Sequence, residues 1–191
     1  MARHAVDVPA NYMPSPQSHL KNARDAAHYL WAIQTAPRRA LDVGAWDGWL
    51  AALLWRKGIV CDCVELVEGL ANANMRYAMA HEQVRHVYHG WFDEVPIPGR
   101  YDAVFMFEVL EHIPLDAVPE YIAKAESLLF KNGRVMVSLP DQPHEENRQH
   151  QWTPSEVLIR SMWGHNHYFH VEYKDYPGTS IPGNWMASWT K

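Results

Sequence analysis

The sequence predicts an α/β fold in which helices cover both faces of a doubly wound, mostly parallel sheet. The first observation is a short apolar run that breaks at Gly44 and Gly48 and then resumes as a helix. The second is the alternation of apolar runs of strand length with segments of helical periodicity. The third is the segment 103–107, which is apolar throughout, as expected for a strand buried on both faces. These observations indicate one domain over residues 15–191, preceded by a flexible arm over residues 1–14.

The individual elements follow from the apolar pattern and from the residues that interrupt it. Helical spacing over residues 17–35 predicts a first helix, which must end before Pro37. Strands are expected at 40–44, 59–65, 84–88, 102–107, 134–139, 167–173 and 184–190, and further helices at 48–57, 69–81 and 116–130. Lys131, Asn132 and Gly133 resemble a helix cap. The pattern Thr-Pro-Ser-Glu at 153–156 predicts a last helix, capped by the threonine hydroxyl and running to about Gly164.

Composition limits the class of protein. With 48% apolar and 20% charged residues the chain is globular, and no apolar run reaches the roughly 20 residues that span a bilayer. No signal-like segment begins the chain, so we expect a cytoplasmic protein without membrane contact. The net charge of −5 disfavours general affinity for nucleic acid, although a local RNA site stays open. Cys61 and Cys63 face the same side of a strand and are expected to be a buried, reduced pair.

The glycines and one acid predict a nucleotide site. Gly44 and Gly48 allow a tight turn after the strand and a close approach of the backbone to a ligand. The amides at the start of the next helix then point toward that ligand. Glu65 closes the second strand, where its carboxylate can accept hydrogen bonds from a ribose diol. The Gly-x-x-x-Gly spacing differs from the dinucleotide fingerprint, so a nicotinamide oxidoreductase is disfavoured.

Several segments resemble the class I methyltransferases, which use S-adenosylmethionine. Residues 41–48 (LDVGAWDG) resemble their first motif, and Glu65 resembles their ribose-binding acid. Residues 101–114 (YDAVFMFEVLEHIP) resemble the fourth strand and the following turn, and residues 128–140 the fifth strand with the turn before it. The resemblance covers about residues 38–140. It implies a Rossmann-like, doubly wound, mostly parallel seven-stranded sheet with an antiparallel last strand.

The same resemblance implies a set of cofactor-binding residues. They are Asp42, Gly44, Trp46, Gly48, Glu65, Phe92, Asp93 and Phe107. Asp42 would orient the amino group of the methyl donor, although it could simply cap a turn. Trp46 could cover the sulfonium, because aromatic faces attract cations, or it could pack in the core. Asp93 and Phe92 are expected to contact adenine, since Trp91 stands where the family often has its acid.

A second cluster is expected on the acceptor side. On a helical turn after Phe107, the side chains of Glu108, Glu111 and His112 would share one face. Glu108 and His112 are the candidate catalytic residues, with His112 or Glu108 as the general base, while the alternative is that Glu111 and His112 only cap the turn. In similar subfamilies, the ubiquinone O-methyltransferases and the small-RNA 2′-hydroxyl methyltransferases, a Glu-x-x-Glu-His motif and a later histidine hold a divalent metal. Here that set would be Glu108, Glu111, His112 and His144 or His150, but we expect metal-free transfer.

The sequence therefore predicts an S-adenosylmethionine-dependent methyltransferase that acts on an oxygen of a small molecule, such as a sugar, a phenol or another metabolite. No Asn-Pro-Pro-Tyr motif and no cysteine follow the fourth strand, which disfavours methylation of a DNA amine and covalent attack on a pyrimidine. Two alternatives stay open: a methyltransferase of tRNA or other RNA, and a non-catalytic module that binds S-adenosylmethionine. The sequence identifies neither the acceptor nor the oligomeric state.

Overall fold

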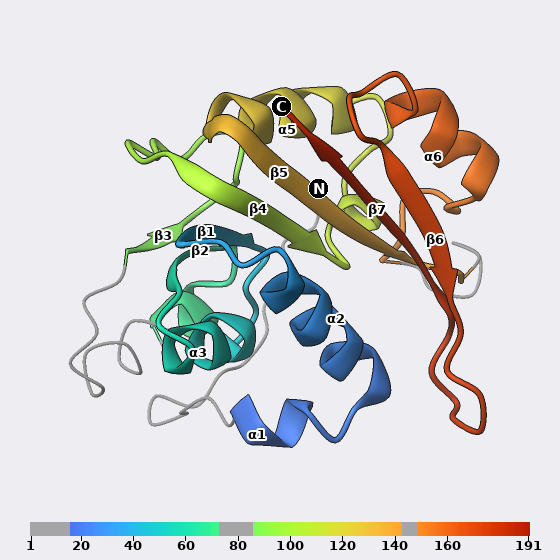
Figure 1. Cartoon of the computed structure of the whole chain (residues 1–191), viewed down its shortest axis with the longest axis horizontal. Coiled ribbons are helices and arrows are strands. Elements are labelled where there is room, and N and C mark those ends of the chain that lie inside the picture. The colour runs from blue at the N-terminus through green and yellow to red at the C-terminus, as the bar shows by residue number, and fades with distance from the viewer. Residues whose placement is uncertain (1–15, 73–85, 143–148) are drawn as a thin grey trace. The chain divides into compact units, whose positions relative to one another are not determined.

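The strands form a seven-stranded sheet in the order β3-β2-β1-β4-β5-β7-β6 (Figure 1). The computed structural model describes residues 16–72, 86–142 and 149–191. β7 pairs antiparallel with both β5 and β6, whereas β2 pairs parallel with β1 and β3, and β4 pairs parallel with β5. The predicted mostly parallel sheet with an antiparallel last strand is confirmed. By internal contacts the chain divides into two compact units, residues 1–98 and 99–191.

The first unit carries the glycine turn. Its elements are α1 (Pro16–His19), α2 (Ala23–Gln34), β1 (Arg39–Val43), α3 (Trp49–Arg56), β2 (Val60–Glu65) and β3 (Val87–His89). Helix α3 is apolar around its circumference and buried from Leu50 to Trp55, because it packs against β2 on one side and α1 and α2 on the other. Cys61 and Cys63 are free and buried in β2, which confirms the predicted reduced pair.

Two predicted elements of the first unit differ from the structure. The helix expected over residues 17–35 is interrupted, because Asn22 has extended backbone and its side chain accepts hydrogen bonds from the amides of Arg24 and Asp25. This side-chain cap starts α2 as a separate helix. A helix was expected over residues 69–81, and the structure shows residues 68–72 as helical. Residues 73–85 lie outside the described part of the chain. They include the start of the strand expected at 84–88.

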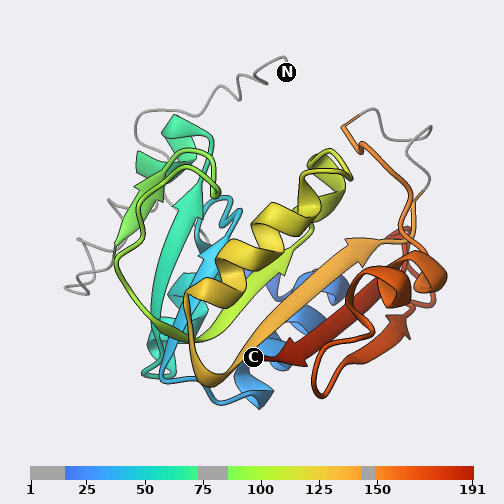
Figure 2. The same ribbon diagram turned by 90° about the horizontal axis from the view of Figure 1, so that it is seen from above.

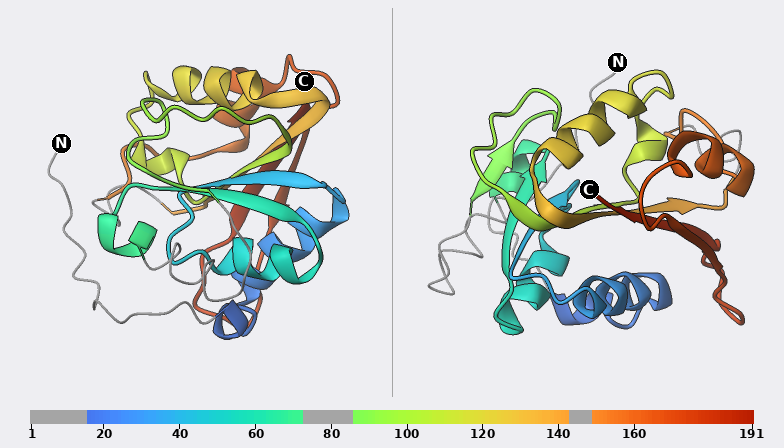
Figure 3. Two further views of the ribbon diagram at one scale, coloured as in Figure 1. Left: turned by 90° about the vertical axis from the view of Figure 1, so that its left-hand side faces the viewer. Right: turned by 45° about the horizontal axis from the view of Figure 1, so that its top comes forward.

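The second unit contains the remaining strands. Its elements are β4 (Tyr101–Phe107), the 3-10 helix η1 (Leu110–His112), α5 (Val118–Ser127), β5 (Leu129–Pro140), α6 (Glu156–Trp163), β6 (His170–Lys174) and β7 (Asn184–Thr190). Helix α5 packs on β5 and α6 packs on β6 (Figure 2). The predicted central strand is confirmed, since Val104, Phe105 and Met106 in β4 are fully buried. The connection between β6 and β7 extends beyond the ends of the strands (Figure 3).

The end of α5 and the start of α6 were predicted wrongly, as were the starts of β5 and β6, which are Leu129 and His170 rather than residues 134 and 167. Helix α5 ends at Ser127 rather than at residue 130, because β5 already begins at Leu129. Gly133 is then not a helix cap but a strand residue, where an added Cβ would lie 3.0 Å from the Cβ of Leu129. The N-cap of α6 is Ser155, whose hydroxyl accepts a hydrogen bond from the Leu158 amide at 3.3 Å, and not the predicted threonine two residues earlier.

Two expectations concern the whole chain: a flexible arm at its start, and no apolar segment that could span a bilayer. The predicted flexible arm over residues 1–14 lies outside the described residues, so the domain boundary at residue 15 stays a prediction. Among the described residues, every helix is too short or too polar to cross a bilayer.

Candidate active site

The loop from Gly44 to Gly48 leaves β1 in an unusual backbone conformation. Gly44 (φ 71°), Trp46 (φ 51°) and Gly48 (φ 78°) all lie in the left-handed region. The amides of Gly44 and Ala45 donate to the carbonyl oxygen of Val64 at 2.9 and 3.0 Å, which ties the loop to the end of β2. Trp46 is the one non-glycine of the three, so its backbone is strained. Its indole side chain is 49% exposed and is not part of the core.

Glu65 holds this loop from the end of β2. Its Oε2 accepts a hydrogen bond from the Trp46 amide at 2.7 Å, and its Oε1 accepts one from the Val67 amide at 2.8 Å. The side chain is buried, and burial raises the pKa of Glu65, an effect that these backbone hydrogen bonds oppose. Each carboxylate oxygen has a second lone pair. The carboxylate can therefore hold the loop and still accept hydrogen bonds from a diol.

Asp42 is buried near the end of β1, two residues before Gly44, where the loop begins. Burial, with the negative charges of Glu65 and Asp47, raises the pKa of Asp42 to about 8. The carboxyl group is therefore mostly neutral at pH 7. A bound cation would reverse this balance, because positive charge favours the ionised form. Asp42, Asp47 and Glu65 thus place three buried acids around this loop.

The adenine residues expected after β3 have contrasting environments. Phe92 is buried, whereas Asp93 is exposed in a turn closed by hydrogen bonds from the amides of Glu94 and Val95 to the Trp91 carbonyl. The Gly90 amide donates to the Glu65 carbonyl at 3.1 Å and fixes the start of this turn beside Glu65. Phe107, the remaining predicted cofactor residue, ends β4 in the second unit and stacks on Phe105 with ring centroids 5.4 Å apart.

Glu108 follows β4 in a left-handed conformation, with φ of 58°. Its Oε1 accepts hydrogen bonds from the Ser138 hydroxyl at 2.9 Å and from the side-chain amide of Asn184. Its backbone amide donates to the carbonyl oxygen of Ser138 at 3.1 Å. Ser138 and Asn184 are fully buried in β5 and β7. Three strands thus fix one carboxylate at the end of the sheet, in a conformation that costs energy.

The prediction that Glu108, Glu111 and His112 share one helical face was wrong. Only residues 110–112 of this segment are helical, and the side chain of Glu108 accepts hydrogen bonds from β5 and β7 instead. Glu111 and His112 meet His150, and one ligand atom from each of the three lies within 4.8 Å of the others. The predicted metal partner His144 lies outside the described residues. His112 Nδ1 lies 3.1 Å from the carbonyl oxygen of Gln149.

The chain after β5 is fastened to η1 on both sides of His150. The Gln151 amide donates to the Glu111 carbonyl at 2.7 Å. The indole N–H of Trp152 donates to the carbonyl oxygens of Leu110 and Ile113 at 3.0 and 3.1 Å. The rings of His112 and His150 meet edge to face with centroids 5.2 Å apart. The sequence suggested His150 as a later histidine but contained no signal for the tryptophan that holds it in place.

Sequence reasoning missed Ser138 and Asn184, the partners of Glu108. The available signal was weak: Ser138 is a single polar residue between apolar strand residues, and Asn184 follows Pro182 and Gly183 at the expected start of a strand. Such residues are buried only when they are hydrogen-bonded, which would have suggested a partner without identifying it.

Comparison with known families decides the class of this protein. The family model described as a methyltransferase domain matches residues 17–173, which is most of the chain. The chain belongs to this methyltransferase family. This match confirms the resemblance to the class I methyltransferases that the glycine turn and the fourth strand suggested. No curated protein matches its sequence significantly.

Solved structures agree with the fold. An O-methyltransferase, so assigned only provisionally, from Nostoc punctiforme has a TM-score of 0.69 at 15% identity; the match covers 92% of this chain but only 57% of that protein. Magnesium protoporphyrin IX methyltransferase from Synechocystis, with bound SAH, has a TM-score of 0.68 at 16% identity, over 92% of this chain and 84% of that one. The N-methyltransferase NodS from Bradyrhizobium japonicum has a TM-score of 0.69 at 11% identity; the match covers 90% of this chain and 98% of that one. At these identities the likeness establishes the fold alone.

Proposed function

We propose that the methyltransferase transfers the methyl group of S-adenosylmethionine to an oxygen atom of a small molecule. The observation that carries the donor assignment is the left-handed loop from Gly44 to Gly48, held against the buried carboxylate of Glu65. Such a turn lets the backbone approach a ligand closely, and the carboxylate can accept hydrogen bonds from the ribose hydroxyls. Similar folds with bound SAH, such as that of magnesium protoporphyrin IX methyltransferase, support the same donor.

Buried acid supports a cationic donor over a dinucleotide. Asp42 and Glu65 both have raised pKa values because they are buried, and Asp47, which lies 3.3 Å from His19, adds a third acidic group. The ammonium and sulfonium of S-adenosylmethionine would neutralise this cluster. The pyrophosphate of a nicotinamide dinucleotide would add negative charge to it, so electrostatics favour the sulfonium donor.

Calorimetry with wild type, Glu65→Ala and Glu68→Gln tests the donor assignment. We expect wild type to bind S-adenosylmethionine or SAH and not NAD. Glu65→Ala should weaken binding by about 1.5–3 kcal/mol, the range for hydrogen bonds to a charged group. Glu68 is an exposed glutamate three residues further on, and its substitution should leave the affinity unchanged. NAD binding at micromolar affinity without binding of S-adenosylmethionine would refute the proposal.

An oxygen acceptor is supported by the groups after β4. Methyl transfer breaks the bond from carbon to sulfur as the new bond from oxygen to carbon forms, and the electron pair stays on sulfur as a thioether. The hydroxyl proton must go to a base. A neutral His112 whose Nδ1–H donates to the Gln149 carbonyl carries its lone pair on Nε2, the nitrogen that can accept this proton. Glu108 would contact the acceptor hydroxyl or hold a second polar group of the substrate.

Two alternatives to a small-molecule methyltransferase are methylation of RNA and binding of the methyl donor without catalysis. Methylation of RNA is disfavoured by the net charge of −5, and binding of tRNA that weakens steeply with salt would favour it instead. A non-catalytic module would bind the donor without turnover on any hydroxyl acceptor. An NMR or mass-spectrometric screen of sugars and phenols with labelled donor separates these outcomes from the small-molecule assignment.

Metal-assisted transfer is a second candidate, favoured by the proximity of Glu111, His112 and His150. A carboxylate and two imidazoles form a donor set that suits a divalent transition metal or zinc. Burial and the nearby His112 lower the pKa of His150, which keeps its imidazole neutral as ligation requires. Glu108 does not belong to this group, because it bonds to Ser138 and Asn184. A bound metal would lower the pKa of an acceptor hydroxyl.

Chelation separates the two routes. Without a metal, EDTA should leave turnover unchanged, and His112→Ala should lower it by about 10²–10⁴-fold, as for loss of a general base. With a metal, EDTA should abolish turnover without changing donor affinity, and added zinc or manganese should restore it. His165→Ala, at an exposed histidine after α6, is the matched control and should behave as wild type. We expect the metal-free outcome.

A further inference from the structure

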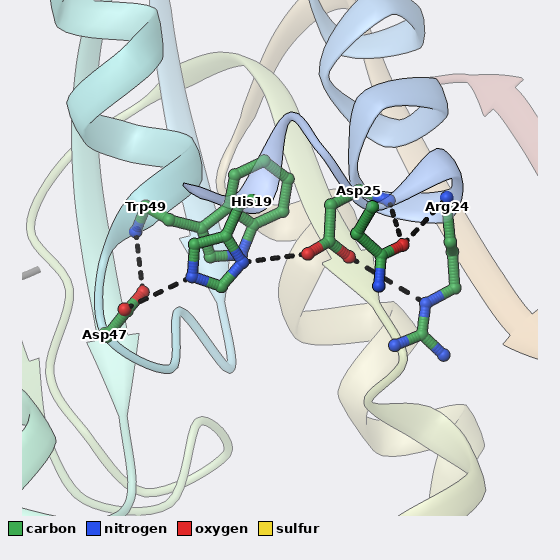
Figure 4. A network of polar contacts seen from close by, with 6 residues as sticks. His19, Arg24, Asp25, Asp47 and Trp49 are labelled. Atoms are coloured by element: carbon green, nitrogen blue, oxygen red, sulfur yellow. Dashed lines mark hydrogen bonds and ion pairs between the residues drawn. The ribbon is translucent and has the colours of Figure 1, made fainter. Parts of the chain in front are cut away.

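His19, at the end of α1, connects three parts of the first unit (Figure 4). Its Nδ1 lies 2.8 Å from Oδ2 of Asp25 in the first turn of α2. Its Nε2 lies 3.3 Å from Oδ2 of Asp47 in the glycine loop. Its ring stacks on Trp49, the first residue of α3, with centroids 5.0 Å apart and planes 11° from parallel. One side chain thus joins both preceding helices to the loop.

The geometry favours the charged form of the imidazole. A neutral histidine has one N–H, and it can donate to only one carboxylate, whereas the imidazolium donates from both nitrogens. The stack on the electron-rich face of Trp49 also favours a cation. In agreement, the hydrogen bonds to Asp25 and Asp47 raise the pKa of His19 to about 9. Among the described residues, the charged groups around His19 are these two carboxylates, with Arg24 3.8 Å from Asp25.

Asp47 transmits this contact to the donor loop. It is buried, its Oδ2 faces His19 and its Oδ1 accepts a hydrogen bond from the Trp49 amide at 3.1 Å. The loop around it contains the strained Trp46, and such strain persists only where the surrounding structure fixes the backbone. Glu65 fixes the loop from the side of the sheet, and His19 fixes it from the side of the helices. Without His19, Asp47 would be a buried carboxylate that has lost its cation.

We propose that His19 is a positioning residue for the methyl donor, which acts through Asp47 to hold the loop from Gly44 to Gly48 in its binding conformation. The proposal rests on the donor assignment made above, but the loop conformation can be measured without any donor. It extends the donor site beyond the motif residues to α1, more than twenty residues earlier in the chain. An apparent dissociation constant rises in proportion as the binding-competent fraction falls, so loosening the loop lowers affinity without removing a ligand contact.

Calorimetry with SAH tests the proposal on His19→Gln, which retains one amide donor but loses the charge and the ring. We expect its dissociation constant at pH 7 to rise about tenfold, the scale of one lost charged hydrogen bond. Asp25→Asn, which weakens the pair from the far side, should give a smaller rise. His170→Gln is the matched control, because His170 is an exposed histidine 3.6 Å from a glutamate on β6. Turnover at saturating donor should be unchanged in all three.

The pH profile identifies the charged form. The ratio of the His19→Gln to the wild-type dissociation constant should fall toward one as pH rises through about 9, because wild-type His19 then loses its proton. Taking the ratio cancels the ionisation of Asp42 in the same range. A ratio of one at pH 7, with both proteins folded by circular dichroism, would overturn the proposal.

Amide hydrogen exchange without donor provides the independent measurement. The Trp46 and Trp49 amides, which donate to Glu65 and Asp47, should exchange faster in His19→Gln than in wild type. If wild type binds no SAH, the donor assignment fails, and this comparison still decides whether His19 holds the loop. Equal exchange rates in the two proteins would contradict it.

Discussion

Asp42 shows how one buried carboxyl group can make stability depend on pH. In water an aspartate ionises near pH 4, but folding buries this carboxyl group beside the negative charges of Glu65 and Asp47 and raises its pKa to about 8. The folded protein therefore holds a proton that the unfolded chain releases between these pH values. Stability from this group is fully present below pH 4 and is lost progressively as the pH rises to 8.

Substitution Asp42→Asn should remove that pH dependence. Relative to wild type, the free energy of unfolding of the variant should rise with pH by up to about 1.4 kcal/mol per unit between pH 5 and 8, and level off above 8. Donor affinity should fall, because the amide cannot neutralise an ammonium group. Urea denaturation across this pH range measures the first effect. Asp116→Asn, at an exposed position, is the control and should give a flat difference; a flat difference for Asp42→Asn would refute the argument.

Strand register explains why Glu108 is held so firmly. In the parallel pair β4 and β5, Phe107 lies opposite Ser138, so the next residue of the chain reaches the serine hydroxyl. In the antiparallel pair β5 and β7, Pro140 lies opposite Asn184, the first residue of β7. Both hydrogen-bond donors therefore arrive at one carboxylate from adjacent strands. A shift of one residue in either pair would turn one donor to the opposite face of the sheet.

Replacement of Asn184, the hydrogen-bond donor on β7, should therefore reduce catalysis. Asn184→Ala is expected to lower turnover roughly tenfold, in line with one lost hydrogen bond to a charged group, while SAH affinity stays unchanged. Asn184→Asp should be worse, because a second carboxylate would face Glu108. Ser188→Ala, another buried polar position on β7, is the control and should retain turnover. Steady-state kinetics measure these effects, and full turnover in Asn184→Ala would exclude a role for the Glu108 geometry.

The sequence predicted the elements better than their ends. Apolar strands such as β4 are recognisable because burial on both faces leaves little choice of residue. The break before α2 was missed because the capping of Asn22 depends on a single side chain within an otherwise helical pattern. The end of α5 was missed for a similar reason: Lys-Asn-Gly is compatible with a helix cap and with a strand that contains Asn132 at positive φ.

The candidate site was predictable only where one segment contains the chemistry. Gly44, Gly48 and Glu65 lie at fixed offsets around one strand and its neighbour, so spacing alone suggests their roles. The partners of Glu108 lie 30 and 76 positions away along the chain, and His19 lies 28 positions from Asp47. No local pattern connects residues at such separations, because tertiary packing alone brings them together.

At the scale of the whole molecule, the two compact units divide the proposed chemistry. Every proposed donor residue except Phe107 lies in residues 1–98, and both candidate catalytic residues lie in residues 99–191. The positioning residues keep to the same division, His19 with the donor loop and Ser138 and Asn184 with Glu108. Each half therefore contains the supports for its own functional groups.

This division has a consequence for how such an enzyme can change over generations. Under the proposed assignments, substitutions in residues 99–191 can alter which molecule is methylated while the donor residues that lie in residues 1–98 are inherited intact. A recombination event near Pro98 would leave each positioning residue with the group that it holds.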